Sequence, residues 1–104
     1  YPDFSREIEI LSARAPDMSK TLSHEVVAFV QKIRDEELFK KPGVAETIDW
    51  AKCLMALDVL SLSPESISDT LGAILKYQDD ISKLQVAEVK RILVDARALL
   101  DSIE

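Results

Sequence analysis

The sequence of 104 residues contains little cysteine, glycine or proline, and each scarcity excludes a class of protein. The single cysteine, Cys53, excludes a disulfide framework and a CxxC metal motif, so a reducing cytoplasm is the expected location. Two glycines and four prolines provide no glycine-rich phosphate loop and suit long helices joined by short connections. No apolar run approaches the roughly 20 residues of a membrane span, and no signal peptide is visible. We therefore expect no membrane association.

The chain is acidic overall. A net charge of −6 argues against a nucleic-acid-binding module, which would present a basic face. Hydrophobic residues make up 47% of the chain and charged residues 31%, a balance that favours a folded globular protein over a disordered one. A chain of this length forms one domain. Residues 1–104 are therefore expected to form a single domain that binds no nucleic acid.

Apolar residues recur at three- and four-residue steps, which is the pattern of amphipathic helices. Alternation of period two never persists, and no Asn-Gly or Asp-Gly turn is present, so no strand is expected. The chain is predicted to be all-α, a small bundle of about five helices. The expected helices are one capped by Asp3 or Ser5, one following Ser19–Ser23, one from Val44 to about Leu57, one from Ser63-Pro64 to about Tyr77, and one capped by Asp79 or Asp80.

The expected second helix combines a wide apolar face with a polar face. The polar face is predicted to carry His24, Glu25, Gln31, Lys32 and Arg34. Trp50, the sole tryptophan, is expected in the core, with contact to a neighbouring domain as the alternative. Three lysines, Lys40, Lys41 and Lys76, could touch the phosphates of a nucleotide, although solvated lysines on an acidic protein are the simpler expectation.

The sequence shows no set of His, Cys or acidic residues at the spacing that a catalytic or metal site needs. His24 is the only histidine, so the sequence has no His-x₃-His metal spacing, and Cys53 has no sequence neighbour that would activate a thiolate. The acidic pairs Glu7/Glu9 and Asp79/Asp80 do not form carboxylate dyads, since residues one or two apart on a helix do not face each other. We therefore expect no catalytic residue and no metal site, and we expect that this chain alone is not an enzyme.

The residue types of the segment that begins at Lys40 indicate a role beyond core packing. Pro42-Gly43 ends the preceding segment, and Val44 opens an amphipathic helix whose first turn carries Glu46. The free N–H groups of a helix N-terminus form an anion-friendly end that can hold a phosphate. A well-formed helix start without any ligand is the alternative. The candidate ligand-binding residues are Val44, Ala45 and Glu46.

Four segments, in this order along the chain, resemble the C-terminal helical lid of MoxR-type AAA+ ATPases, in the branch linked to carbon monoxide dehydrogenase maturation. The resemblance covers residues 1 to about 85, and the remaining residues match only as an amphipathic helix. The segments are Phe4-Ser5-Arg6-Glu7-Ile8-Glu9-Ile10-Leu11, Val26-Val27-Ala28-Phe29-Val30, Lys41-Pro42-Gly43-Val44-Ala45-Glu46-Thr47-Ile48-Asp49-Trp50-Ala51 and Asp69-Thr70-Leu71-Gly72-Ala73-Ile74-Leu75-Lys76-Tyr77.

The resemblance implies a lid domain cut from a longer ATPase whose α/β nucleotide-binding domain precedes Tyr1. ATP and Mg²⁺ would be bound by that full-length protein, and Val44, Ala45 and Glu46 would lie toward the nucleotide. The implied partners are the protein's own ATPase domain, neighbouring subunits in a ring, and a von Willebrand factor A-domain protein. The family's sensor-two arginine has no match, because the corresponding place holds Ala45 and Glu46.

A free-standing helical adaptor that binds another protein, without catalytic activity, is the alternative function. The apolar pair Leu38-Phe39 fits either an interdomain contact or a loop folded over the core. A native start codon just upstream of Tyr1 would favour the adaptor.

Overall fold

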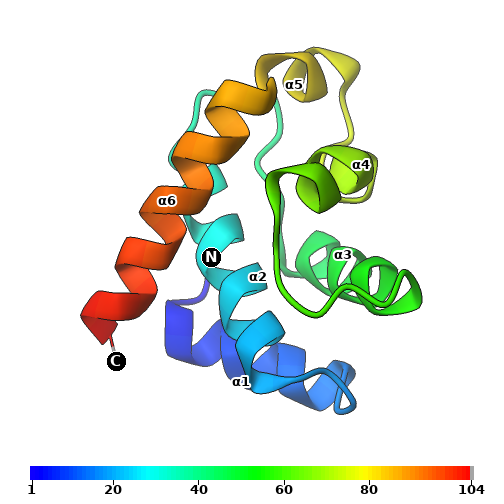
Figure 1. Cartoon of the computed structure of the whole chain (residues 1–104), viewed down its shortest axis with the longest axis vertical. Helices are drawn as coiled ribbons and strands as arrows, with labels where there is room; N and C mark the ends of the chain where they lie inside the picture. The colour runs from blue at the N-terminus through cyan, green and yellow to red at the C-terminus, as the bar shows by residue number, and fades with distance from the viewer. Residues whose placement is uncertain (104) are drawn as a thin grey trace.

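A computed structural model describes residues 1–103 and contains no strand within them, so the all-α prediction is confirmed. Figure 1 shows the helices packed into one bundle. The described part has six helices, one more than expected, because the predicted last helix is divided into a short and a long one. The helices are α1 (Phe4–Arg14), α2 (Lys20–Ile33), α3 (Val44–Ala56), α4 (Pro64–Ile74), α5 (Gln78–Lys83) and α6 (Val86–Ile103).

The starts of three helices follow from local capping. Asp3 accepts a hydrogen bond from the backbone N–H of Arg6 at the start of α1, and Ser19 accepts one from the N–H of Leu22 at the start of α2. Ser63 caps α4 directly before Pro64, as expected. These side chains each satisfy an N–H that has no partner within the helix, which is why they define the boundary.

The helix α4 ends at Ile74, before the expected end at Tyr77. Leu75, at its C-cap, has extended backbone angles (φ −110°, ψ 131°) and is buried. The chain then runs extended to Tyr77, which precedes α5. Tyr77 therefore lies on a connection between two helices and is half exposed (51%).

The helix α2 is the centre of the bundle and packs against α1, α3 and α6. In Figure 1 it runs through the middle, between α6 on one side and α3 on the other. An unbroken run of buried apolar residues from Val26 to Val30 and the buried Ile33 explain this position, since a helix with so wide an apolar surface needs neighbours on several sides.

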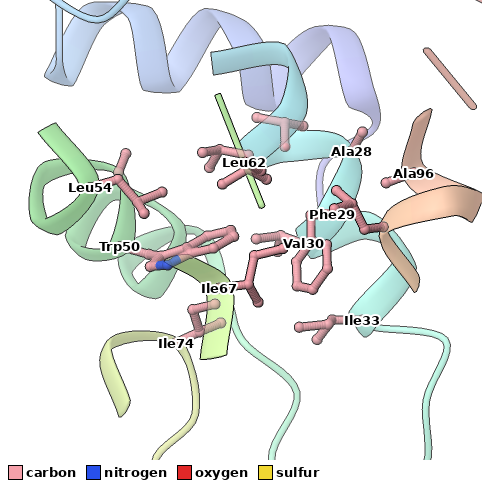
Figure 2. Packing of buried hydrophobic residues seen from close by; sticks show 14 of the residues in the cluster. Ala28, Phe29, Val30, Ile33, Trp50, Leu54, Leu62, Ile67, Ile74 and Ala96 are labelled. Carbon is pink, nitrogen blue, oxygen red and sulfur yellow. The ribbon is translucent and has the colours of Figure 1, made fainter. Parts of the chain in front are cut away.

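The core prediction for Trp50 is confirmed, because its side chain is fully buried. Its ring lies 5.5 Å from that of Phe29, measured between centroids, and Figure 2 shows both rings surrounded by aliphatic side chains. The indole N–H donates to Thr70 Oγ1 at 2.7 Å, so the one polar atom of the side chain is satisfied inside the core. This contact joins α3 to α4.

Candidate binding surface at the start of α3

The N-terminus of α3 is formed by Gly43, Val44 and Glu46. The Glu46 carboxylate reaches back and accepts a hydrogen bond from the N–H of Gly43 at 3.0 Å, and the N–H of Thr47 donates to the Gly43 carbonyl at 3.1 Å. Gly43 has extended backbone angles (φ −92°, ψ −169°), so the turn does not use the left-handed conformation that favours glycine. The helix start is therefore held mainly by the Glu46 side chain.

The three residues predicted to bind a ligand lie together at this helix end. Val44 is half-buried, Ala45 is exposed and Glu46 is half-buried. Because the Glu46 carboxylate already occupies the Gly43 N–H, a bound phosphate would share the helix end with a negative charge. A ligand-binding role for these residues stays a prediction.

A buried ion pair lies directly behind this helix start. The guanidinium of Arg34 donates from Nη1 and Nη2 to the two carboxylate oxygens of Glu7, each at 2.7 Å. Thr47 Oγ1 donates to the same carboxylate at 2.9 Å, and Gln31 Nε2 donates to it at 3.0 Å. The pair therefore links α1, α2 and α3 through one carboxylate, in the bidentate geometry that gives the strongest charge-assisted hydrogen bonds.

The same arginine also holds the turn before α3. Arg34 Nε donates to the carbonyl of Pro42 at 2.7 Å, and its guanidinium carbon lies 4.5 Å from the centroid of the Tyr1 ring. The Arg34 side chain is almost fully buried, with the exposed Tyr1 ring covering it. The position of the Pro42-Gly43 turn is thus determined by the residue that directly follows the central helix.

Two opposing effects act on the pKa of Glu7. Burial raises this pKa, because it disfavours the charged carboxylate. The hydrogen bonds from Arg34, Gln31 and Thr47, together with the charge of Arg34, outweigh burial and hold the pKa below its ordinary value of 4.5. Glu7 is therefore an ionised carboxylate in the folded protein at neutral pH.

The structure corrects the predicted polar face of the second helix, because Arg34 and Glu25 are both buried. Glu25 accepts from the N–H of Leu62 at 2.9 Å and from Ser61 Oγ at 3.0 Å, and it pairs with Arg97 of α6 at 3.3 Å. These partners lie far along the chain, so helical periodicity alone could not reveal them. Buried charges are tolerated here because each is paired and hydrogen-bonded.

The two residues of the acidic pair Glu7/Glu9 differ in burial. Glu7 is fully buried, whereas Glu9 is exposed and pairs with Arg6 on the surface. A signal for Glu7 was available, since it lies one helical turn before the buried Leu11 and so within the apolar stripe of α1.

Neither Asp79 nor Asp80 caps a helix, contrary to expectation, because both lie inside α5, whose N-cap is Tyr77. Asp80 is fully buried. Its Oδ1 accepts from the N–H of Phe39 at 2.7 Å, and its Oδ2 accepts from the N–H of Lys40 at 3.1 Å. Asp80 therefore fastens the loop between α2 and α3 to α5, and Figure 1 shows this loop passing close to α5.

The fastened loop presents an aromatic side chain to solvent. Phe39 is 76% exposed, and its ring lies 5.8 Å from the ring of Tyr77, measured between centroids. Leu38, in contrast, is half-buried against the core. Lys40 and Lys41 follow Phe39 in sequence and Lys76 precedes Tyr77; all three are exposed, and within residues 1–103 none of them forms an ion pair. We call these five residues, Phe39, Lys40, Lys41, Lys76 and Tyr77, the aromatic–lysine surface.

A concavity of about 510 Å³ between α2 and α6 is lined in part by His24 and Arg97, and the His24 ring makes an edge contact with Phe4 at 5.8 Å. Cys53 is half-buried in α3. In the part of the chain that the structure describes, no group of three or more His, Cys, Asp or Glu side chains could hold a metal ion.

Comparisons with family models, with curated proteins and with solved structures find no match to this chain. No helix within residues 1–103 is long and apolar enough to cross a membrane.

Proposed function

We propose that this chain is the helical lid of a cytoplasmic MoxR-type AAA+ ATPase. In this proposal the lid closes over ATP and Mg²⁺ bound by a preceding α/β domain, and it couples hydrolysis to the remodelling or maturation of a protein complex. Neighbouring subunits of a ring and a von Willebrand factor A-domain protein are the proposed partners.

One observation carries the proposal: Tyr77, the last residue of one specific segment of the resemblance, lies against Phe39, which stands two residues before the segment that begins at Lys41. The segment that opens α3 follows directly on Phe39 and Lys40, and the segment that includes α4 ends at Tyr77. These positions lie far apart in sequence, yet the rings of Phe39 and Tyr77 are in contact. This exposed aromatic pair, at the end of one segment and just before the other, suits contact with another domain.

The internal contacts support a lid that moves as one body. The Glu7–Arg34 pair joins the first three helices, and Asp80 joins the loop before α3 to α5. Rigid-body rotation of such a unit needs contacts that differ between the two nucleotide states, and the exposed face provides a place for them.

Nucleotide contact without a sensor-two arginine would depend on the N-terminus of α3. Ala45 and Glu46 stand at the corresponding place, so the candidate contacts are backbone N–H groups and the Glu46 carboxylate. Glu46→Ala in the full-length ATPase tests the second of these. Unchanged ATP hydrolysis and nucleotide affinity would remove Glu46 from the site.

The test of the proposal is to isolate the native protein from its source cells with an antibody against this chain. We expect a polypeptide much larger than the 11.6 kDa of residues 1–104, with Mg²⁺-dependent ATP hydrolysis. A native polypeptide near 11.6 kDa would contradict the lid assignment. The exposed Phe39 and Tyr77 would then favour the second candidate, a free-standing adaptor that binds another protein.

A further inference from the structure

We propose that Tyr1 and Pro2 form a releasable strap over Arg34, and that the position of this strap controls how firmly the start of α3 is held. The strap deepens the proposed function and rests on it for its use, because the start of α3 is the proposed nucleotide contact. In a lid, a change in the path of the chain ahead of α1 would reach that contact through Arg34. The coupling itself lies within residues 1–103, so it can be measured without nucleotide.

The strap joins the central helix to the turn before α3. Gln31 Nε2, in α2, donates to the carbonyl of Pro2 at 3.3 Å. The Tyr1 hydroxyl donates to the carbonyl of Lys41 at 3.5 Å. The guanidinium carbon of Arg34 lies over the Tyr1 ring, 4.5 Å from its centroid, which is the geometry of a cation–π contact. Two residues ahead of α1 therefore contact both the central helix and a loop about 40 residues further along the chain.

Arg34 connects the strap to the start of α3. Its Nε donates to the carbonyl of Pro42 at 2.7 Å, and its two Nη atoms donate to the carboxylate of Glu7. Thr47 of α3 donates to the same carboxylate. Because the donors of a guanidinium form one rigid, planar fork, a tilt of the plane displaces all of these bonds together. A ring packed on the guanidinium restricts that tilt and so keeps the turn in place.

The strap is held much less firmly than the group it covers. Tyr1 is 75% exposed, and its hydroxyl bond of 3.5 Å is at the outer limit of a hydrogen bond. The bonds between Arg34 and Glu7, in contrast, are 2.7 Å long and buried. Segments with few buried contacts open at a far smaller free-energy cost than the core. The strap can therefore leave while the ion pair stays formed, which defines a closed and an open state.

Opening of the strap should loosen the start of α3 in particular. In the open state water reaches the guanidinium and competes for the bond between Arg34 Nε and the Pro42 carbonyl. Two amides report on the start of the helix. The N–H of Gly43 donates to Glu46 Oε1, and the N–H of Thr47 donates to the Gly43 carbonyl. Both amides should exchange with solvent faster once the turn is no longer held.

Amide hydrogen exchange of residues 1–104, followed by NMR, tests this coupling. In Tyr1→Ser we expect the exchange rates of the Gly43 and Thr47 amides to rise about two- to fivefold, the scale set by one exposed cation–π contact. The matched amides are those of Ser66 and Ile67 at the start of α4, which are held by Ser63. These two amides should keep their native rates, because a helix start held by its own cap opens independently of the strap.

Two further variants separate the ring from its hydroxyl and from general surface effects. Tyr1→Phe should keep near-native rates at Gly43 and Thr47, since the ring still lies over the guanidinium and only the long hydroxyl bond is lost. The matched control is Val94→Ser, which removes an apolar side chain from α6 that is also well exposed (66%). This control should leave the rates at the start of α3 unchanged.

Three results would overturn the proposal. Unchanged rates at Gly43 and Thr47 in Tyr1→Ser would show that the strap does not hold the start of α3. Equal increases at the starts of α3 and α4 would show only a loss of overall stability. An equal effect of Tyr1→Phe and Tyr1→Ser would remove the role of the ring. Each of these outcomes leaves the lid assignment to be decided by the size and ATP hydrolysis of the native protein.

Discussion

Replacing Arg34 by methionine should destabilise this protein more than any surface change. The substitution keeps an apolar stem of similar length but removes the guanidinium that donates to both oxygens of Glu7 at 2.7 Å. The fully buried carboxylate of Glu7 then keeps only Gln31 and Thr47 as donors. The carbonyl of Pro42 also loses its donor.

The size of the effect follows from what remains unpaired. Removing one partner of a buried ion pair costs about 3–5 kcal/mol, because the other charge stays buried without compensation. Total stability of such domains is about 5–15 kcal/mol. At about 4–8 °C per kcal/mol for a domain of this size, the melting temperature of Arg34→Met should fall by more than about 12 °C.

Urea and thermal unfolding, followed by the fluorescence of the single buried tryptophan, measure this loss. The matched control is Arg6→Met, which breaks the exposed pair with Glu9 and should cost less than about 1 kcal/mol. The double variant Glu7→Leu/Arg34→Met should recover part of the stability, because it leaves no unpaired buried charge. If Arg34→Met costs no more than Arg6→Met, the stabilising role assigned to the buried pair is wrong.

Four further outcomes are expected. The lowered pKa of Glu7 contributes stability that is complete above pH 4.5 and is lost as the pH falls through the folded-state pKa, so acid titration should destabilise the native chain more than the Glu7→Leu/Arg34→Met variant. Asp80→Asn should cost about 1–3 kcal/mol, because it places an amide donor against a backbone N–H, and tryptic cleavage after Lys40 should be faster. Trp50→Phe should lose about 2 kcal/mol in urea unfolding through a small cavity and the missing indole hydrogen bond. Glu46→Ala should lower thermal stability by about 0.5–1 kcal/mol, since the Gly43 N–H loses its acceptor, and no loss would contradict the capping role.

The start of each capped helix could be predicted because capping is a local interaction. Asp3, Ser19 and Ser63 each bond to an N–H only three residues ahead, so residue type and spacing carry the information. Burial of Trp50 could be predicted for a similar reason, because it lies on the apolar side of a regular helix. The same kind of local signal placed the start of α3 at Val44, which is confirmed, whereas ligand binding by Val44, Ala45 and Glu46 stays a prediction.

No local sequence signal predicts that the last helix is divided into α5 and α6. Neither glycine nor proline stands between α5 and α6, where residues 84 and 85 connect the two helices. Leu84 is buried there with non-helical backbone angles (φ −94°, ψ 67°), so tertiary packing overrides the local preference for helix.

The sequence by itself determined the all-helical class, the capped starts of α1, α2 and α4 and the apolar core, because these depend on contacts within a few residues. Only the tertiary structure decided which charges are buried. Glu7 and Arg34 are 27 residues apart, and Asp80 and Phe39 are 41 apart, so their pairing depends on how the helices pack. The aromatic–lysine surface has the same origin, since it exists only where the loop before α3 meets the start of α5.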